Sequence, residues 1–176
     1  MDGLSIYPNG HVDYLMYENG GALIGVAKVT VPTVKYKTVT VTGAGIMGDL
    51  EIPLAGMIDA MKVNIQFSSV TDAAVQLGTN EWHDVALYAA DQYFDSVNRT
   101  EEMDAVRFEM SIRPTETNMG TVATASAADA SGVYSACKYA VFKNNQKIVD
   151  IDQLNHVHMV NGVDNAEKVR KALGLM

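Results

Sequence analysis

Hydrophobic residues recur at every second position along several segments of this chain, and this period of two constrains the fold more than any other feature. In 59–67 the apolar side chains fall on one face, opposite Lys62, Asn64 and Gln66, and in 105–113 they alternate with charged and small polar residues. Such alternation predicts β-strands with one buried and one solvated face. The expected buried residues are Met61, Val63, Ile65 and Phe67, followed by Val106, Phe108, Met110 and Ile112.

Turn signals separate these segments from further strands. Glu18–Gly21 and Lys143–Lys147 have the composition of hairpin turns. Half-solvated strands joined by short turns favour antiparallel sheet. The fold class is therefore mainly β, an antiparallel barrel or sandwich, with further strands expected at 12–17, 22–31, 34–42, 84–93, 133–143 and 147–151.

Two short helices complete the expected single domain, which covers 1–176. Thr71 is placed to cap a helix over Asp72–Leu77, and Gly78 follows it. Asp164 is placed to cap a C-terminal helix within 164–173, which carries an apolar stripe and ends before Gly174. Two segments lack regular patterning: a long loop at 43–56 and a flexible loop at 115–132.

Composition excludes several classes of protein. The formal net charge of −8 argues against a module that reads DNA or RNA and against binding to an anionic membrane. With Cys137 as its one cysteine, the chain forms no internal disulfide. The N-terminus lacks a signal-peptide pattern, and no apolar run is long enough to span a bilayer, so we expect a protein folded in a cytoplasm.

The glycine-rich run Gly43–Gly48 matches the GxGxxG pattern of dinucleotide-binding sites. That function requires a helix to begin at the run, yet Pro53 and Gly56 oppose one. A nucleotide-binding enzyme is therefore the alternative of a different class. We favour an exposed loop whose apolar side chains become ordered against a partner; these are Ile46, Met47, Leu50, Ile52 and Leu54.

Other catalytic or metal-binding patterns are weak. His156 and His158 lie two residues apart and, with Asp152 or Asp164, would supply part of a zinc site, but a third firm ligand is missing. No nucleophile elbow, ordered Ser-His-Asp set or HExxH motif is present. We therefore expect no enzyme activity, no catalytic residue, no cofactor and no metal.

Three segments together resemble the tail tube proteins of contractile phage tails and of R-type bacteriocins. They are the run Thr42–Pro53 (TGAGIMGDLEIP), the segment Val70–Leu77, and the C-terminal region with Asp150–Asn155, Val160–Asp164 and Val169–Leu175. Their order and spacing cover almost the whole chain. The resemblance leads us to expect larger apolar or aromatic residues at positions 156 and 158, where this chain has histidines.

The resemblance implies a β-barrel subunit of the tail-tube type that forms hexameric rings, which stack into a hollow tube inside a contractile sheath. The implied partners are further copies of the chain and the sheath, tape-measure, baseplate and tube-terminator proteins, with DNA as non-specific cargo in a true phage and no membrane insertion by the subunit alone. The implied location is a virion tail or bacteriocin particle, and a related contractile secretion system is the alternative within this class. The expected inter-subunit loop comprises Gly43, Gly45, Ile46, Met47, Leu50, Ile52, Pro53 and Leu54.

Overall fold

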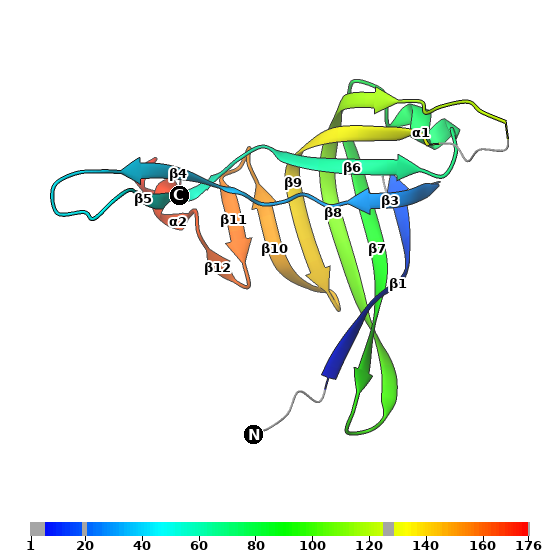
Figure 1. The fold of residues 1–176 in the computed structure, drawn as a ribbon, viewed down its shortest axis with the longest axis horizontal. Helices are drawn as coiled ribbons and strands as arrows, with labels where there is room; N and C mark the ends of the chain where they lie inside the picture. The colour runs from blue at the N-terminus through cyan, green and yellow to red at the C-terminus, as the bar shows by residue number, and fades with distance from the viewer. Residues whose placement is uncertain (1–5, 19–20, 125–128, 176) are drawn as a thin grey trace.

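The computed structural model describes residues 6–18, 21–124 and 129–175, and these form mostly antiparallel β-sheet (Figure 1). The strands are β1 (Ile6–Glu18), β2 (Ala22–Ile24), β3 (Val26–Thr30), β4 (Tyr36–Val41), β5 (Leu50–Ile58), β6 (Met61–Phe67), β7 (His83–Asp95), β8 (Thr100–Asn118), β9 (Ser131–Lys143), β10 (Gln146–Asp152), β11 (Val157–Val160) and β12 (Val163–Asp164). The helices are α1 (Asp72–Gln76) and α2 (Glu167–Ala172). Within the described ranges, no helix has the length and apolar character needed to cross a membrane.

A large curved sheet in the strand order β12-β11-β10-β9-β8-β7-β1-β2 forms the body of the molecule (Figure 1). Strand β6 pairs with residues 131–136 of β9, and β3 pairs with β6, so these two strands form a second layer. Among the described residues, no strand pairing joins β3 to β2. Of the two architectures expected from the sequence, the sandwich therefore fits and a closed barrel is not formed.

The core lies between these layers and confirms the alternation in the sequence. Met61, Val63, Ile65 and Phe67 of β6 are buried, while the intervening residues of β6 are exposed. On β8, Met110 and Ile112 are buried, and Val106 and Phe108 pack partly buried against the core. The opposing side chains include Met16, Ile24, Val85, Leu87, Tyr134, Tyr139 and Ile151.

Gly132 in β9 is required by the packing of Tyr134, which lies two residues further along the same strand face. A Cβ atom at position 132 would lie 2.5 Å from the Tyr134 hydroxyl oxygen and 2.6 Å from a ring carbon. The Tyr134 ring is almost fully buried, so its neighbours restrict any movement away from a Cβ atom at position 132. Glycine therefore allows this aromatic side chain to cover the strand directly.

The turns and helices follow the sequence signals with altered boundaries. Asn144 and Asn145 both have positive φ, as a two-residue type I′ hairpin turn requires. At the first predicted turn, the Gly21 amide donates to the Glu18 carbonyl, while Asn19 and Gly20 lie outside the described residues. The Thr71 hydroxyl accepts from the Ala74 amide at 3.2 Å, which confirms the predicted cap of α1.

The predicted C-terminal helix within 164–173 is shorter in the structure. Val163 and Asp164 pair with β11 as β12, and α2 begins at Glu167. The Asp164 carboxylate still accepts from the Ala166 amide at 2.9 Å and forms an ion pair with Arg170. The predicted cap is therefore wrong: the N-cap residue of α2 is Ala166, which makes no side-chain cap hydrogen bond, and the helix begins later because sheet pairing extends to Asp164.

Two predicted loops are shorter in the structure, because strands extend into both. In 43–56, the residues from Leu50 onward belong to β5 and pair with β4, so the irregular part is 42–49. In 115–132, β8 continues to Asn118 and β9 begins at Ser131. The loop there is limited to 119–130, of which 125–128 lie outside the described residues.

Candidate assembly interface

A two-stranded hairpin, here called the arm and comprising residues 36–58, extends away from the body (Figure 1). Its strands β4 and β5 pair only with each other and form a separate sheet. The register places Thr38 opposite Pro53, Val39 opposite Ile52, and Val41 opposite Leu50. An isolated two-stranded sheet is marginally stable in water, so an arm of this kind is suited to being covered by a partner.

The register gives the arm one apolar face and one polar face. Because side chains alternate along each strand, Val39 and Val41 share a face with Leu50, Ile52 and Leu54, whereas Thr38, Thr40, Glu51 and Pro53 share the opposite face. The apolar side chains remain in solvent: Leu50 is 49% exposed and Ile52 is 45% exposed. A row of exposed aliphatic side chains typically marks an interaction surface.

The predicted inter-subunit residues divide between the tip and β5. Gly43, Gly45, Ile46 and Met47 lie in the tip, and Leu50, Ile52, Pro53 and Leu54 lie on β5. The Ile46 amide donates to the Gly43 carbonyl at 3.2 Å, and Gly45 and Gly48 both have positive φ. The glycines thus turn the chain sharply at the tip, where Met47 is completely exposed.

The glycine-rich run does not have the structure of a dinucleotide site. Such a site needs a helix N-terminus after the glycines, because its backbone amides bind the pyrophosphate. Here Gly48 is followed by strand β5, and the run turns a hairpin. Pro53 is accommodated because each strand of a two-stranded ribbon has one free edge, at which a missing amide donor costs no sheet hydrogen bond.

The base of the arm contacts α2 closely. Gly56 has a φ of 68°, and a Cβ atom there would lie 3.0 Å from both Cα and Cβ of Ala166. Arg170 of α2 pairs with Asp164 and donates from Nη1 to the His156 carbonyl at 2.8 Å. Hydrogen bonding from Arg170 lowers the pKa of the Asp164 carboxyl below its usual value. The Gly56–Ala166 contact holds the base of the arm against α2, and the Arg170 contacts hold α2 to β12 and to the turn before β11. Within the described part of the chain, the apolar side chains of the outer arm remain exposed.

The two histidines weighed as partial zinc ligands have different environments. His156 lies exposed in the turn before β11 with a φ of 53°, whereas His158 is buried in β11. No group of three or more potential ligand side chains forms a metal cluster in the described part of the chain. Position 158 is buried and position 156 is exposed, so a large apolar residue would suit the first and not the second.

Sequence reasoning missed a buried polar cluster in the body. The Nδ1 atom of His83 lies 2.5 Å from Oε1 of Glu18, and its Nε2 atom lies 3.2 Å from the Thr79 carbonyl oxygen. The Thr79 hydroxyl donates its proton to the Gln76 carbonyl at 2.8 Å. The hydroxyl proton is therefore directed away from the His83 imidazole. This cluster ties β1 to the end of α1. Glu18 and His83 are 65 residues apart, and no local pattern signals their contact.

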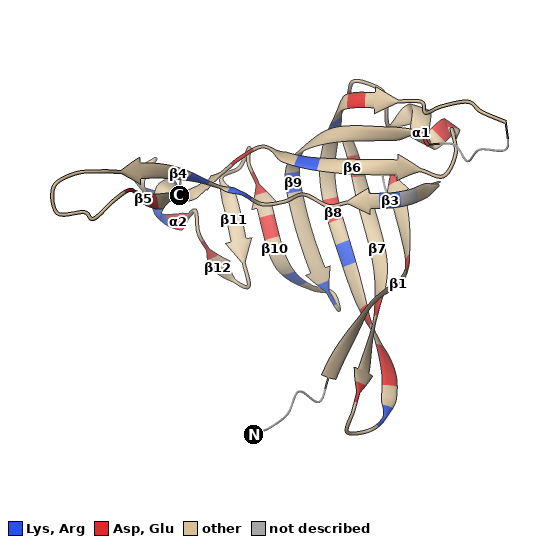
Figure 2. Cartoon of the chain, in the orientation of Figure 1, with Lys and Arg blue, Asp and Glu red and all other residues tan. Residues whose placement is uncertain are grey.

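Charged side chains are distributed unevenly over the molecule (Figure 2). The extension formed by the outer parts of β1, β7 and β8 carries Asp91, Asp95, Glu101, Glu102 and Asp104.

On the sheet face opposite the core, the Arg107 guanidinium lies 4.2 Å from the centre of the Phe142 ring. That face therefore combines charged and aromatic groups.

Most of the chain is similar to known tail tube proteins. Residues 12–174 match the family described as phage tail tube protein FII. A curated relative, the tail tube protein of Escherichia phage P2, is 26% identical over 167 residues, which cover 91% of this chain and 94% of the relative.

Solved structures of an extracellular contractile injection system have a similar fold. One, from the sheath/tube terminator of the PVC system in its extended state, has a TM-score of 0.54 at 12% identity and covers 77% of this chain and 97% of the other. A second, from the PVC sheath–tube complex, has a TM-score of 0.51 at 14% identity and covers 73% of this chain and 87% of the other. With the family match spanning nearly the full length, this chain belongs to the phage tail tube protein FII family.

Proposed function

We propose that this tail tube subunit forms hexameric rings, which stack into the hollow inner tube of a contractile tail. Contraction of a surrounding sheath then drives the tube through the target envelope. The observation that carries the proposal is the arm, an amphipathic ribbon whose apolar face has no partner within the described part of its own chain. Membership of the tail tube family supports further copies of the same subunit as the partner.

The open edges of the body support the same proposal. Strands β2 and β12 end the main sheet, and β3 pairs on one side only, with β6. Unpaired strand edges tend to associate with other strands. When six subunits close into a ring, the sheet of each is continued by its neighbour, so no edge remains open.

The proposed partners beyond the subunit itself are the sheath, tape-measure, baseplate and tube-terminator proteins. Support for the sheath and the terminator comes from the solved relatives, which are parts of a sheath–tube complex and of a sheath/tube terminator. The proposed location is the tail of a virion or of a bacteriocin particle, assembled in the cytoplasm of the bacterial host. DNA passes through as non-specific cargo where a capsid is attached.

The proposed role requires no catalysis. The net charge of −8 suits a conduit that must not retain phosphate groups, since a basic wall would bind them. The subunit acts mechanically, as a wall that transmits force. The alternative within this class is a tube subunit of a related contractile secretion system, which would also act as a mechanical wall. Neighbouring genes distinguish the two: sheath and tape-measure genes indicate a phage tail or bacteriocin, and a secretion ATPase gene indicates a secretion system.

Electron microscopy of the purified protein, alone and co-expressed with tail partners, tests the proposal. We expect rings and stacked tubes with a hollow axis. Images of the native particle further show whether a capsid is attached, which separates a phage tail from a bacteriocin. Monodisperse monomers under all conditions, including co-expression, would contradict the proposed function.

A further inference from the structure

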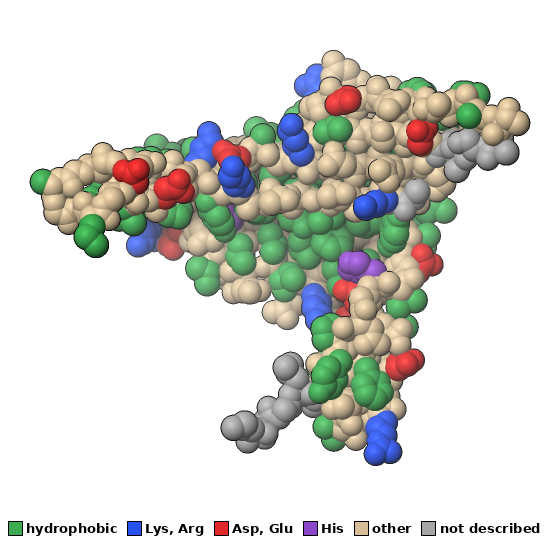
Figure 3. All heavy atoms as spheres, viewed as in Figure 1, with side chains coloured by type: hydrophobic (Ala, Val, Ile, Leu, Met, Phe, Trp, Pro, Cys, Tyr) green, Lys and Arg blue, Asp and Glu red, His purple; other side chains and the backbone are tan. Residues whose placement is uncertain are grey.

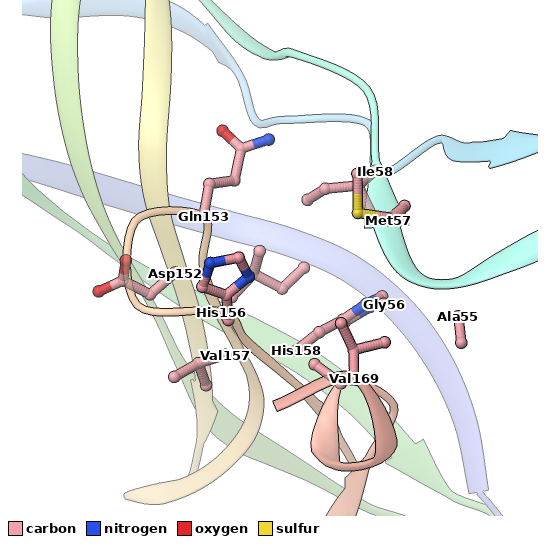
Figure 4. Close-up of a pocket in the computed structure, with 12 residues that line it drawn as sticks. Ala55, Gly56, Met57, Ile58, Asp152, Gln153, His156, Val157, His158 and Val169 are labelled. Atoms are coloured by element: carbon pink, nitrogen blue, oxygen red, sulfur yellow. The ribbon is translucent and has the colours of Figure 1, made fainter. Parts of the chain in front are cut away.

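A pocket of about 160 Å³ lies where the base of the arm meets the C-terminal region (Figure 4). Its walls come from β5, the turn between β10 and β11, β11 itself and α2. Gly56 and Met57 line one side, Val169 another, and His156 and His158 a third (Figure 4). Apolar cavities of similar size in other proteins hold a benzene molecule, so this volume accepts one medium-sized side chain.

His158 is the unusual member of this lining. Its side chain is only 2% exposed, yet neither ring nitrogen has a hydrogen-bond partner in the described structure. Its ring stacks on Tyr36 of the arm, with the ring centres 5.4 Å apart. Burial lowers the pKa of the imidazole, which favours the neutral ring with one donor and one acceptor. Leaving both nitrogens unsatisfied is costly, so an occupant of the pocket that brings a polar group to the ring would stabilise it.

The tip of the arm has the complementary properties. Met47 is completely exposed, and its flexible thioether side chain adapts to irregular pockets. Among the described residues, the peptide N–H and C=O of Met47 make no hydrogen bond. A peptide group offers both a donor and an acceptor, which is the pair that a neutral imidazole needs.

The arm of a subunit cannot fill the pocket of that same subunit. Leu50 and Gly56 are separated by roughly 20 Å along β5 at the usual rise of about 3.3 Å per residue, and the tip lies beyond Leu50. In Figure 1 the tip points away from α2. Only the tip of another copy can reach the pocket.

Asp49 and Glu51 lie next to the tip, and no salt bridge engages them within the described ranges. On α2 at the pocket, Arg170 and Lys171 are already paired with Asp164 and Glu167, and Lys168 is the cation of this helix that no salt bridge engages in the described structure. Figure 3 shows acidic side chains on the outer part of the arm and apolar ones at its end. The acidic residues beside the tip and the available Lys168 favour a second copy of the chain as the occupant.

We propose that Met47 at the arm tip of one subunit inserts into the pocket formed by Gly56, His158 and Val169 at the arm base of a neighbouring subunit. The inference rests on the proposed function, because it specifies one contact of the tube. The contact joins two different surfaces and is therefore heterologous. When such a contact is repeated from subunit to subunit, it produces a closed ring or an open stack, and assembly does not stop at a dimer.

Cross-linking tests the contact directly. In a background with Cys137→Ser, the paired substitutions Met47→Cys and His156→Cys place one thiol at the tip and one at the mouth of the pocket. Tubes assembled under reducing conditions and then oxidised should yield a ladder of disulfide-linked oligomers, which neither single substitution produces. The matched control pairs Met47→Cys with Val97→Cys, which, like His156, is an exposed position in a turn.

The outcomes separate the contact from the function. Tubes that form without a ladder, or that cross-link equally well in the control pair, overturn the tip-into-pocket contact and leave the tube function standing. Failure of the unmodified chain to form tubes overturns the function itself. A ladder specific to the Met47–His156 pair supports both.

Met47→Ala provides a second measurement that does not depend on cysteine chemistry. Burying a methionine side chain stabilises an interface enough to change its association constant by roughly tenfold to a hundredfold. We therefore expect the critical concentration for tube assembly to rise by about tenfold or more. Val122→Ala, at a fully exposed site in the 119–130 loop, is the matched control. Equal effects of the two substitutions would contradict the proposal.

Discussion

The body and the arm have the same period-two pattern but opposite burial. On β6, the apolar residues Met61 and Val63 are completely buried. On β5, Ile52 also lies on the apolar face of its strand, yet it is 45% exposed. The difference lies in the number of layers. Strand β6 packs against the curved sheet, while β4 and β5 form a single two-stranded layer. Alternation thus identifies strands with an apolar face, but only a second layer buries that face, and for the arm we propose that other subunits supply it.

The first prediction concerns the buried cluster of the body and has the largest expected effect on the free energy of unfolding of the subunit. His83→Ala removes the imidazole partner of Glu18 and leaves the carboxylate buried. We expect a loss of about 3–5 kcal/mol, measured by chemical denaturation of the subunit.

The matched control is His11→Ala, because His11 is paired with Asp91 at an exposed site. A loss below about 1 kcal/mol is expected there. Equal effects of the two substitutions would show that the buried cluster is no more important to the body than a surface pair.

The second prediction tests how tightly the body is packed. Gly132→Ala forces a Cβ atom against the buried Tyr134 ring, so we expect a loss of about 1–3 kcal/mol in the free energy of unfolding. Gly25→Ala is the control, because a Cβ atom at position 25 meets nothing within 4 Å. Unfolding curves that coincide for the two variants would contradict the packing described for β9.

The third prediction concerns the ion pair that holds α2, the helix next to the base of the arm, to β12. Because the pKa of Asp164 is lowered in the folded subunit by Arg170, the carboxylate stabilises the fold above its unfolded pKa of about 4, and this stabilisation is lost as the pH falls through the folded pKa. Unfolding measured from neutral pH down to about pH 3 should show a smaller acid-induced loss in Asp164→Asn than in the unmodified chain. The same pH dependence in both would refute the assignment.

The fourth prediction has the smallest effect on the subunit and the largest on assembly. Deleting residues 44–54 removes the outer arm, whose apolar side chains contact no core. We expect a folded, soluble subunit whose free energy of unfolding changes by less than about 1 kcal/mol, with no tubes visible by electron microscopy. Unfolding of the shortened subunit would instead place these residues in the core of the body.

Much of the body could be predicted from sequence because its signals are local. The alternation in 59–67 and the asparagines at 144 and 145 each determine structure within a few residues. Thr71 likewise acts three residues away, on Ala74. In such segments the burial pattern and the turn chemistry agree, and the structure follows them.

The arm and the polar cluster were harder to predict for physical reasons. Pro53 and Gly56 are poor strand residues, so the residues of β5 up to Gly56 fall within the predicted 43–56 loop. The contacts of His83 with Glu18 and of Gly56 with Ala166 join segments far apart in the chain. They depend on the folded topology, which no local window of sequence contains.

Hydrogen exchange of the arm in isolated subunits and in assembled tubes tests the central claim most directly. Exchange in 36–58 should be rapid in the subunit and slower by about tenfold or more in the tube, while β9 should be protected in both. This result would show that the arm is covered only by other subunits. Equal protection of the arm in the two states would contradict the account.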